Sequence, residues 1–161
     1  MHQLRVDFKN AQREVRVHIS SKGVHSIIET VLILEDKKAD GLSVSLVSDK
    51  VMRKYHKRFF GDPSSADCIT LPLDADFDQN VPFRYLGEIF VCPKTALEYV
   101  KNDTTTFWKE LTLYIVHGLL HLVGYNDITK TQRATMRQRE RKAMSLLAKK
   151  SLLLSGSFRS S

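Results

Sequence analysis

The sequence predicts an α/β (α+β) fold: a single layered domain with a small mixed four-stranded sheet, about five helices and a central buried helix. Its 161 residues are a usual length for one domain. Short segments of alternating apolar residues, typical of strands, are interspersed with segments of helical periodicity. Residues 107–123 (FWKELTLYIVHGLLHLV) are apolar almost all round, as expected of a central helix. We expect residues 1–150 to form the domain and residues 151–161 to be a mobile C-terminal tail.

The first half of the chain predicts strand, helix, strand, helix. Residues 4–8 (LRVDF) alternate as in a strand, and a second alternating stretch (VRVHI) leads into a helix with apolar residues spaced three and four apart over 24–32. Residues 36–41 predict a turn, and 42–47 (LSVSLV) alternate as a strand. Ser48 begins a second helix, apolar on one side and basic on the other. The basic side carries four candidates for RNA binding: Arg53, Lys54, Lys57 and Arg58.

The second half predicts two strands followed by three helices. CITL and EIFVC are the strand segments, separated by a long polar surface loop at 73–85. A proline directly after EIFVC suits the first turn of a helix. The buried helix over 107–123 follows, and Gly124 ends it. Thr129 and Gln132 have the spacing of a capping box, which starts the last helix.

Positive charge is concentrated at the C-terminal end. The net charge is +7, and residues 130–161 hold nine Lys or Arg against one acid, Glu140. A basic end on a neutral body suggests a polyanion partner such as RNA or DNA. A basic helix face that serves solubility is an equal alternative at this point.

Composition also predicts the cellular compartment. The sequence contains no apolar run of 18 residues, and the N-terminal segment (MHQLRVDFKN) lacks the apolar centre of a signal peptide. We therefore expect a cytoplasmic protein with no membrane contact. Its two cysteines, Cys68 and Cys92, are expected to be reduced strand residues.

The segment HGLLHLVGYND, at 117–127, predicts a metal site. His117 and His121 are four apart, so a helix places both imidazoles on one face. Gly124 lets the backbone leave the helix, and Asp127 can return as a third ligand. Three protein ligands leave one position open for water, as in catalytic zinc sites, where zinc lowers the pKa of that water to about 7. Two histidines packed on a buried helix are the alternative.

The same spacing is close to HExxHxxGxxH, the pattern of metzincin proteases. Asp127 stands at the third ligand, and a carboxylate is a legitimate zinc ligand. Gly118 stands where the proteases have the glutamate that acts as general base. This difference argues against peptide hydrolysis.

The chain resembles the YbeY family of bacterial rRNA maturation factors, also called UPF0054 metalloproteins. The family signature HGxLHLxGYDH agrees with HGLLHLVGYND at nine of eleven positions. A family segment LGDI, followed by a strand and a proline at a helix start, is matched by LGEI and FVCPKTA. A third segment, TDVLSFP, is matched loosely by ADCITLP. The resemblance extends from about Leu42 to Met144.

This resemblance implies a zinc-dependent, single-strand-specific endoribonuclease. It implies activity in 16S rRNA 3′-end processing, ribosome maturation and ribosome quality control, with rRNA and the small ribosomal subunit as partners. The metal ligands would be His117, His121 and Asp127, holding one zinc ion per chain, with iron, nickel or manganese as alternatives. A monomer is favoured.

Two departures from the family pattern bear on the chemistry. Asp127 replaces the usual histidine, and a carboxylate makes iron or manganese more acceptable. A family loop, YRGKD, carries an arginine thought to assist at the phosphate, and Phe60 stands at that position. Arg58 and Arg84 are the nearest candidates to replace it.

Other functions stay open from the sequence. One alternative is a non-catalytic rRNA-binding protein of ribosome assembly with a structural metal. Another is a different metal hydrolase, such as a peptidase, and a non-haem iron oxygenase is a more distant one.

Overall fold

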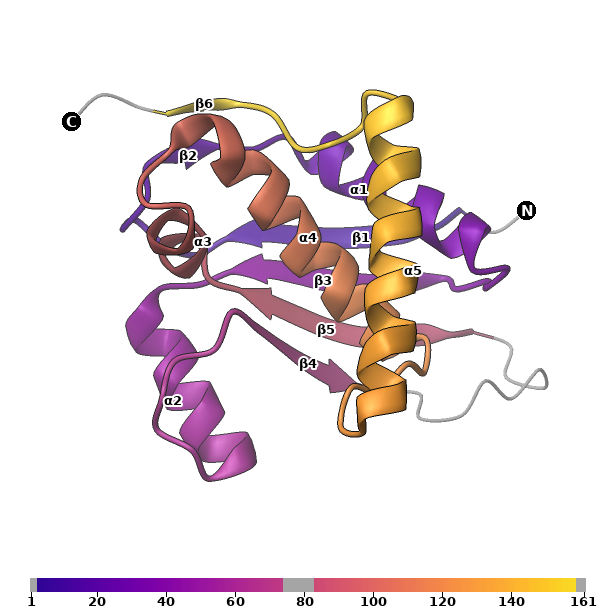
Figure 1. Cartoon of the computed structure of the whole chain (residues 1–161), viewed down its shortest axis with the longest axis horizontal. Helices are drawn as coiled ribbons and strands as arrows, with labels where there is room; N and C mark the ends of the chain where they lie inside the picture. Colours follow the sequence, from indigo (N-terminus) through magenta and orange to yellow (C-terminus); the bar gives the residue numbers. More distant parts are fainter. Residues whose placement is uncertain (1–2, 74–82, 159–161) are drawn as a thin grey trace.

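The computed structural model describes residues 3–73 and 83–158, shown in Figure 1. Most of the long loop predicted at 73–85 lies outside the described residues. The remainder forms the predicted fold, in which helices pack on a small mixed sheet (Figure 1).

A four-stranded sheet in the order β1-β3-β5-β4 confirms the prediction of a small mixed sheet. The strands β1, β3 and β5 are parallel, and β4 is antiparallel to β5 at one edge. β5 begins earlier than the predicted strand EIFVC, because Tyr85 already pairs with Gly41 of β3. The strand bounds are β1 Arg5–Asn10, β3 Gly41–Leu46, β4 Cys68–Pro72 and β5 Tyr85–Val91.

Five helices are present in the described residues, as predicted. The central helix α4 starts ahead of the predicted 107, since Asp103 caps it by accepting a hydrogen bond from the backbone N–H of Thr105. The capping box predicted for α5 is present, with Thr129 and Gln132 bonding reciprocally. The helix bounds are α1 Ser21–Leu34, α2 Asp49–Phe60, α3 Pro93–Tyr99, α4 Thr104–Leu122 and α5 Lys130–Lys149.

The two faces of the sheet have different neighbours. Alternate residues of β3 and β5 on one face, such as Val44 and Ile89, join the main core with α1, α4 and α5. The other face packs against α2 at the β4–β5 end through a smaller cluster that includes Met52, Ile69 and Phe90. Helices α4 and α2 therefore lie on opposite sides of the sheet.

The two ends of the described chain meet in a second, two-stranded sheet that the sequence analysis did not predict. The stretch VRVHI contributes only β2, Val17–His18, which pairs antiparallel with β6, Ser157–Phe158. Leu154, just before β6, is 5% exposed and belongs to the main core. Mobility of residues 151–161 stays a prediction. Among the described residues, no helix has both the length and the apolarity that crossing a membrane requires.

Candidate metal centre

The end of α4 sets the backbone path into the site. The N–H of Gly124 donates to the carbonyl of His121, and the N–H of Tyr125 donates to the carbonyl of Leu120. This pair of bonds is the Schellman arrangement, which needs a left-handed residue after the helix. Gly124 takes that role with φ of 113°. The chain therefore reverses within a few residues of His121.

This reversal brings Asp127 back to the two histidines, as predicted. The Nε2 atoms of His117 and His121 are 3.0 Å apart. Oδ2 of Asp127 lies 3.4 Å from Nε2 of His117 and 3.3 Å from Nε2 of His121. The three side chains are 25%, 23% and 39% exposed, in the order His117, His121, Asp127. These residues form a group that can hold a metal ion, and their partial exposure leaves the group accessible to solvent.

The size of this triangle fits a metal ion. Zinc binds imidazole nitrogen and carboxylate oxygen at about 2.0–2.2 Å, so ligands in tetrahedral positions stand roughly 3.3–3.5 Å apart. The three observed separations of 3.0, 3.3 and 3.4 Å are close to the edges of one such tetrahedral face. The corner opposite this face has no protein ligand among the described residues, which suits a site that binds water or substrate.

Glu140 contacts this group and was not among the site residues predicted from the sequence. Its Oε2 lies 3.5 Å from Nδ1 of His117, on the side of the ring opposite the metal ligand atom. The Glu140 side chain is 15% exposed although it belongs to a mostly charged helix. Carboxylates in this position fix the tautomer and orientation of a metal-binding histidine. The available signal was that Glu140 is the one acid among residues 130–161.

The surrounding acids change the proton affinity of His117. Burial alone would lower the pKa of the imidazole, because it disfavours the charged ring. The hydrogen bond and negative charge of Glu140, with the charges of Asp127 and Asp67, outweigh burial and raise the pKa above its usual value. The same negative surroundings favour a cation at the site.

Close packing against the sheet explains why the residue that follows His117 in α4 is a glycine. A Cβ atom on Gly118 would lie 2.6 Å from Cγ2 of Ile89 and 2.9 Å from Sγ of Cys68. Helix α4 therefore rests directly on β5 and β4 at this position. The glutamate that the metzincin pattern has here would point into the sheet, so it has no room.

Two further contacts hold the loop that carries Asp127. The capping box at Thr129 fixes the loop where α5 begins. The Tyr125 hydroxyl hydrogen bonds with Glu35, and this bond raises the tyrosine pKa. Arg139 of α5 pairs with the same carboxylate, with its Nε 2.9 Å from Oε2. Helices α1 and α5 thus anchor the loop on both sides of Asp127.

The basic residues predicted to bind RNA lie on α2, across the sheet from the two histidines. Arg53 is engaged within its own helix, with Nε 2.8 Å from Oδ2 of Asp49. Arg58 lies over the ring of Phe59, and Phe60 is 57% exposed beside His56. The structure does not bring Arg53, Lys54, Lys57 or Arg58 next to the histidines, and their role in RNA binding stays a prediction.

Comparisons with known proteins identify a matching family and a structure of the same fold. The profile of the family described as Endoribonuclease YbeY matches residues 5–148. Endoribonuclease YbeY of Protochlamydia amoebophila is 34% identical over 149 residues, covering 92% of this chain and 97% of the relative. The Chlamydia abortus protein of the same name is 35% identical over 155 residues, covering 94% and 96%. The solution structure of TM1509 from Thermotoga maritima has the same fold, with a TM-score of 0.55 and 22% identity over 92% of this chain and 95% of that chain.

Proposed function

Because the chain belongs to the Endoribonuclease YbeY family, which makes it an RNA-cleaving enzyme, we propose that it is a zinc-dependent endoribonuclease specific for single-stranded RNA. We further propose that its substrate is the 3′ end of 16S rRNA within the small ribosomal subunit, in the cytoplasm. The observation that carries the zinc proposal is the triangle of His117, His121 and Asp127, whose spacing fits one tetrahedral ion.

The chain's own residues prepare the site for phosphodiester hydrolysis. The two Nε2 atoms and Oδ2 of Asp127 would hold the ion, and Glu140 would keep the Nδ1 proton of His117 in place. When bound, zinc supplies a Lewis acid for the phosphodiester and makes a water molecule more acidic. The close contact of Gly118 with the sheet excludes a glutamate base at position 118, which disfavours the peptidase alternative.

Restriction to single strands has a structural rationale. The ligand atoms lie at the end of α4, between the loop that carries Asp127 and the side chain of Glu140. Unpaired nucleotides can bend their backbone toward such half-buried side chains, whereas a duplex keeps both backbones on a stiff cylinder. We therefore expect cleavage in loops and at unpaired ends.

Removal of single ligands tests this function. His121→Ala and Asp127→Ala should each lower bound zinc and cleavage of a single-stranded 16S 3′-end RNA together, by about 100-fold or more, since a three-ligand site loses one ligand. His18→Ala is the matched control, because His18 is exposed on β2 and outside the site. Metal content is measured by mass spectrometry on protein purified without an affinity tag.

Three outcomes decide between the candidate functions. Cleavage that persists at the wild-type rate in His121→Ala would identify a contaminating nuclease and refute the proposal. Zinc-loaded protein that binds the RNA tightly without cutting it would favour the non-catalytic alternative. Reactivation of metal-free protein by manganese or iron(II) but not by zinc would refute the assignment of zinc and would still support the nuclease function.

A further inference from the structure

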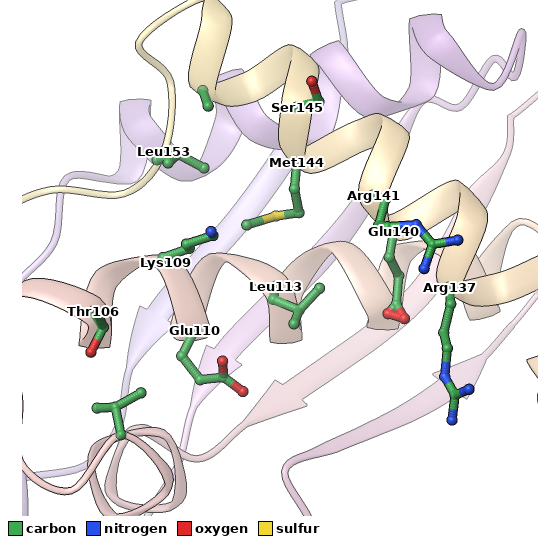
Figure 2. A pocket seen from close by; sticks show the side chains of 12 residues that line it. Thr106, Lys109, Glu110, Leu113, Arg137, Glu140, Arg141, Met144, Ser145 and Leu153 are labelled. Atoms are coloured by element: carbon green, nitrogen blue, oxygen red, sulfur yellow. The ribbon is translucent and has the colours of Figure 1, made fainter.

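A groove of about 680 Å³ runs between α4 and α5 and reaches the side chain of Glu140 (Figure 2). Its apolar part includes Leu113 and Met144. Lys109 lies on the α4 side, and Arg137 and Arg141 lie on the α5 side, one helical turn apart. The groove therefore combines an apolar floor with cations on both walls.

The groove and the metal ligands share one face of α4. Glu110 and Leu113 line the groove, and His117 and His121 continue the same series at intervals of three and four residues. Glu140 belongs to both places, because it lines the groove and contacts Nδ1 of His117. With a rise of 1.5 Å per residue, the path from His117 back to Thr106, at the far end of the groove, is about 16 Å long.

Cations outnumber carboxylates in the lining of the groove, with Lys109, Arg137 and Arg141 against Glu110 and Glu140. Glu110 hydrogen bonds with Tyr114, and Glu140 contacts His117, so each carboxylate already has a partner while keeping its negative charge. Lys109, Arg137 and Arg141 make no ion pair within residues 3–73 and 83–158. Both arginines are exposed. The groove can thus accept a partner that places anionic groups at the two exposed arginines and has flat apolar parts.

We propose that the α4–α5 groove is a substrate subsite that holds the unpaired RNA strand continuing from the cleaved phosphodiester, with Arg137 and Arg141 on its phosphates. This inference rests on the proposed nuclease function. Arginine binds phosphate in a bidentate manner and also stacks on bases, and the floor beside Leu113 and Met144 suits a base face. A protein segment would not by itself require unpaired cations on both walls of the groove.

RNA binding by metal-free protein tests the subsite without cleavage. The full chain is titrated in EDTA against a fluorescent 12-nucleotide single-stranded RNA, as wild type and as the double variant Arg137→Ala/Arg141→Ala. Loss of two phosphate contacts should weaken binding about tenfold. It should also lower the steepness of the plot of log binding constant against log salt concentration by about 1.4. The control double variant, Lys142→Ala/Lys149→Ala, removes the same charge from exposed positions of the same helix outside the groove. We expect about a twofold loss for it, from general electrostatics.

Crosslinking then locates the RNA. The same RNA carrying 4-thiouridine is irradiated with the metal-free protein, and the crosslinked peptides are identified by mass spectrometry. Crosslinks in 106–113 or 137–148 are expected. Thermal unfolding of each variant is measured in parallel, so that loss of the fold is separated from loss of the subsite.

The outcomes for the subsite and for the nuclease function can be told apart. The subsite is refuted if both double variants weaken RNA binding equally, or if crosslinks are confined to α2, even when wild type cleaves RNA. A protein segment would then be the remaining candidate to occupy the groove. Selective weakening by Arg137→Ala/Arg141→Ala with no cleavage by zinc-loaded wild type supports the subsite and refutes the nuclease function.

Discussion

Replacing Gly118 with alanine should destabilise the protein although alanine is the better helix former. Carbon atoms in good contact are about 3.5–4.0 Å apart. The added Cβ would lie 2.6 Å from Cγ2 of Ile89, so helix and strand must separate by roughly 1 Å there. The second short contact, 2.9 Å to Sγ of Cys68, prevents escape by a small sideways shift of the helix.

The size of the effect follows from two opposing contributions. Overpacking of this kind costs about 1–3 kcal/mol. Alanine recovers about 0.8–1.0 kcal/mol relative to glycine in a helix interior. Since the Ile89 methyl is attached to a strand in the sheet centre and cannot swing away, we place the packing cost at the upper end. The expected net loss in free energy of unfolding is about 1–2 kcal/mol.

Urea unfolding of metal-free Gly118→Ala against wild type measures this loss. Gly23→Ala is the matched control in α1, where an added Cβ would meet nothing closer than 3.9 Å. That change should be neutral or stabilising, by up to about 1 kcal/mol. Zinc affinity of Gly118→Ala should also fall, because the neighbouring His117 moves relative to Asp127. If Gly118→Ala is as stable as wild type or more stable, the close-packing explanation for this glycine is refuted.

Two more substitutions test contacts described above. Glu140→Gln keeps the size of the side chain but loses its charge, and it should lower zinc affinity about 10–100-fold in competition with a chromophoric chelator. An unchanged affinity would remove Glu140 from the site. Asp49→Asn tests the start of α2, where hydrogen bonds from Arg53 and then Ser65 lower the pKa of Asp49 below 3.8. A lowered pKa stabilises the fold at pH above 3.8, and this contribution disappears as pH falls through the folded-state pKa. The wild-type advantage over Asp49→Asn, about 0.5–1 kcal/mol at pH 7 in urea unfolding, should therefore shrink on acidification, and an advantage that does not depend on pH would contradict the assignment.

The sequence by itself determined the local geometry of the candidate metal centre. The spacing of His117 and His121 places both rings on one helical face, because the α-helix has a fixed number of residues per turn. Gly124 was recognisable as the residue after the helix, and Thr129 with Gln132 as the next helix start. With both ends of the connection known, the return of Asp127 to the histidines followed from the short chain between them.

Only the tertiary structure decided which distant residues join that centre. Glu140 reaches His117 because α5 packs beside α4 with one particular rotation about its own axis. The periodicity of either segment does not predict that rotation. Helix α2 packs on the opposite face of the sheet from α4, and this placement separates Arg53 and Lys57 from the two histidines. The pairing of β2 with β6 joins segments from the two ends of the chain. Helix and turn geometry depends on neighbours within a few residues, whereas these contacts depend on how complete elements pack, and that is a property of the whole core.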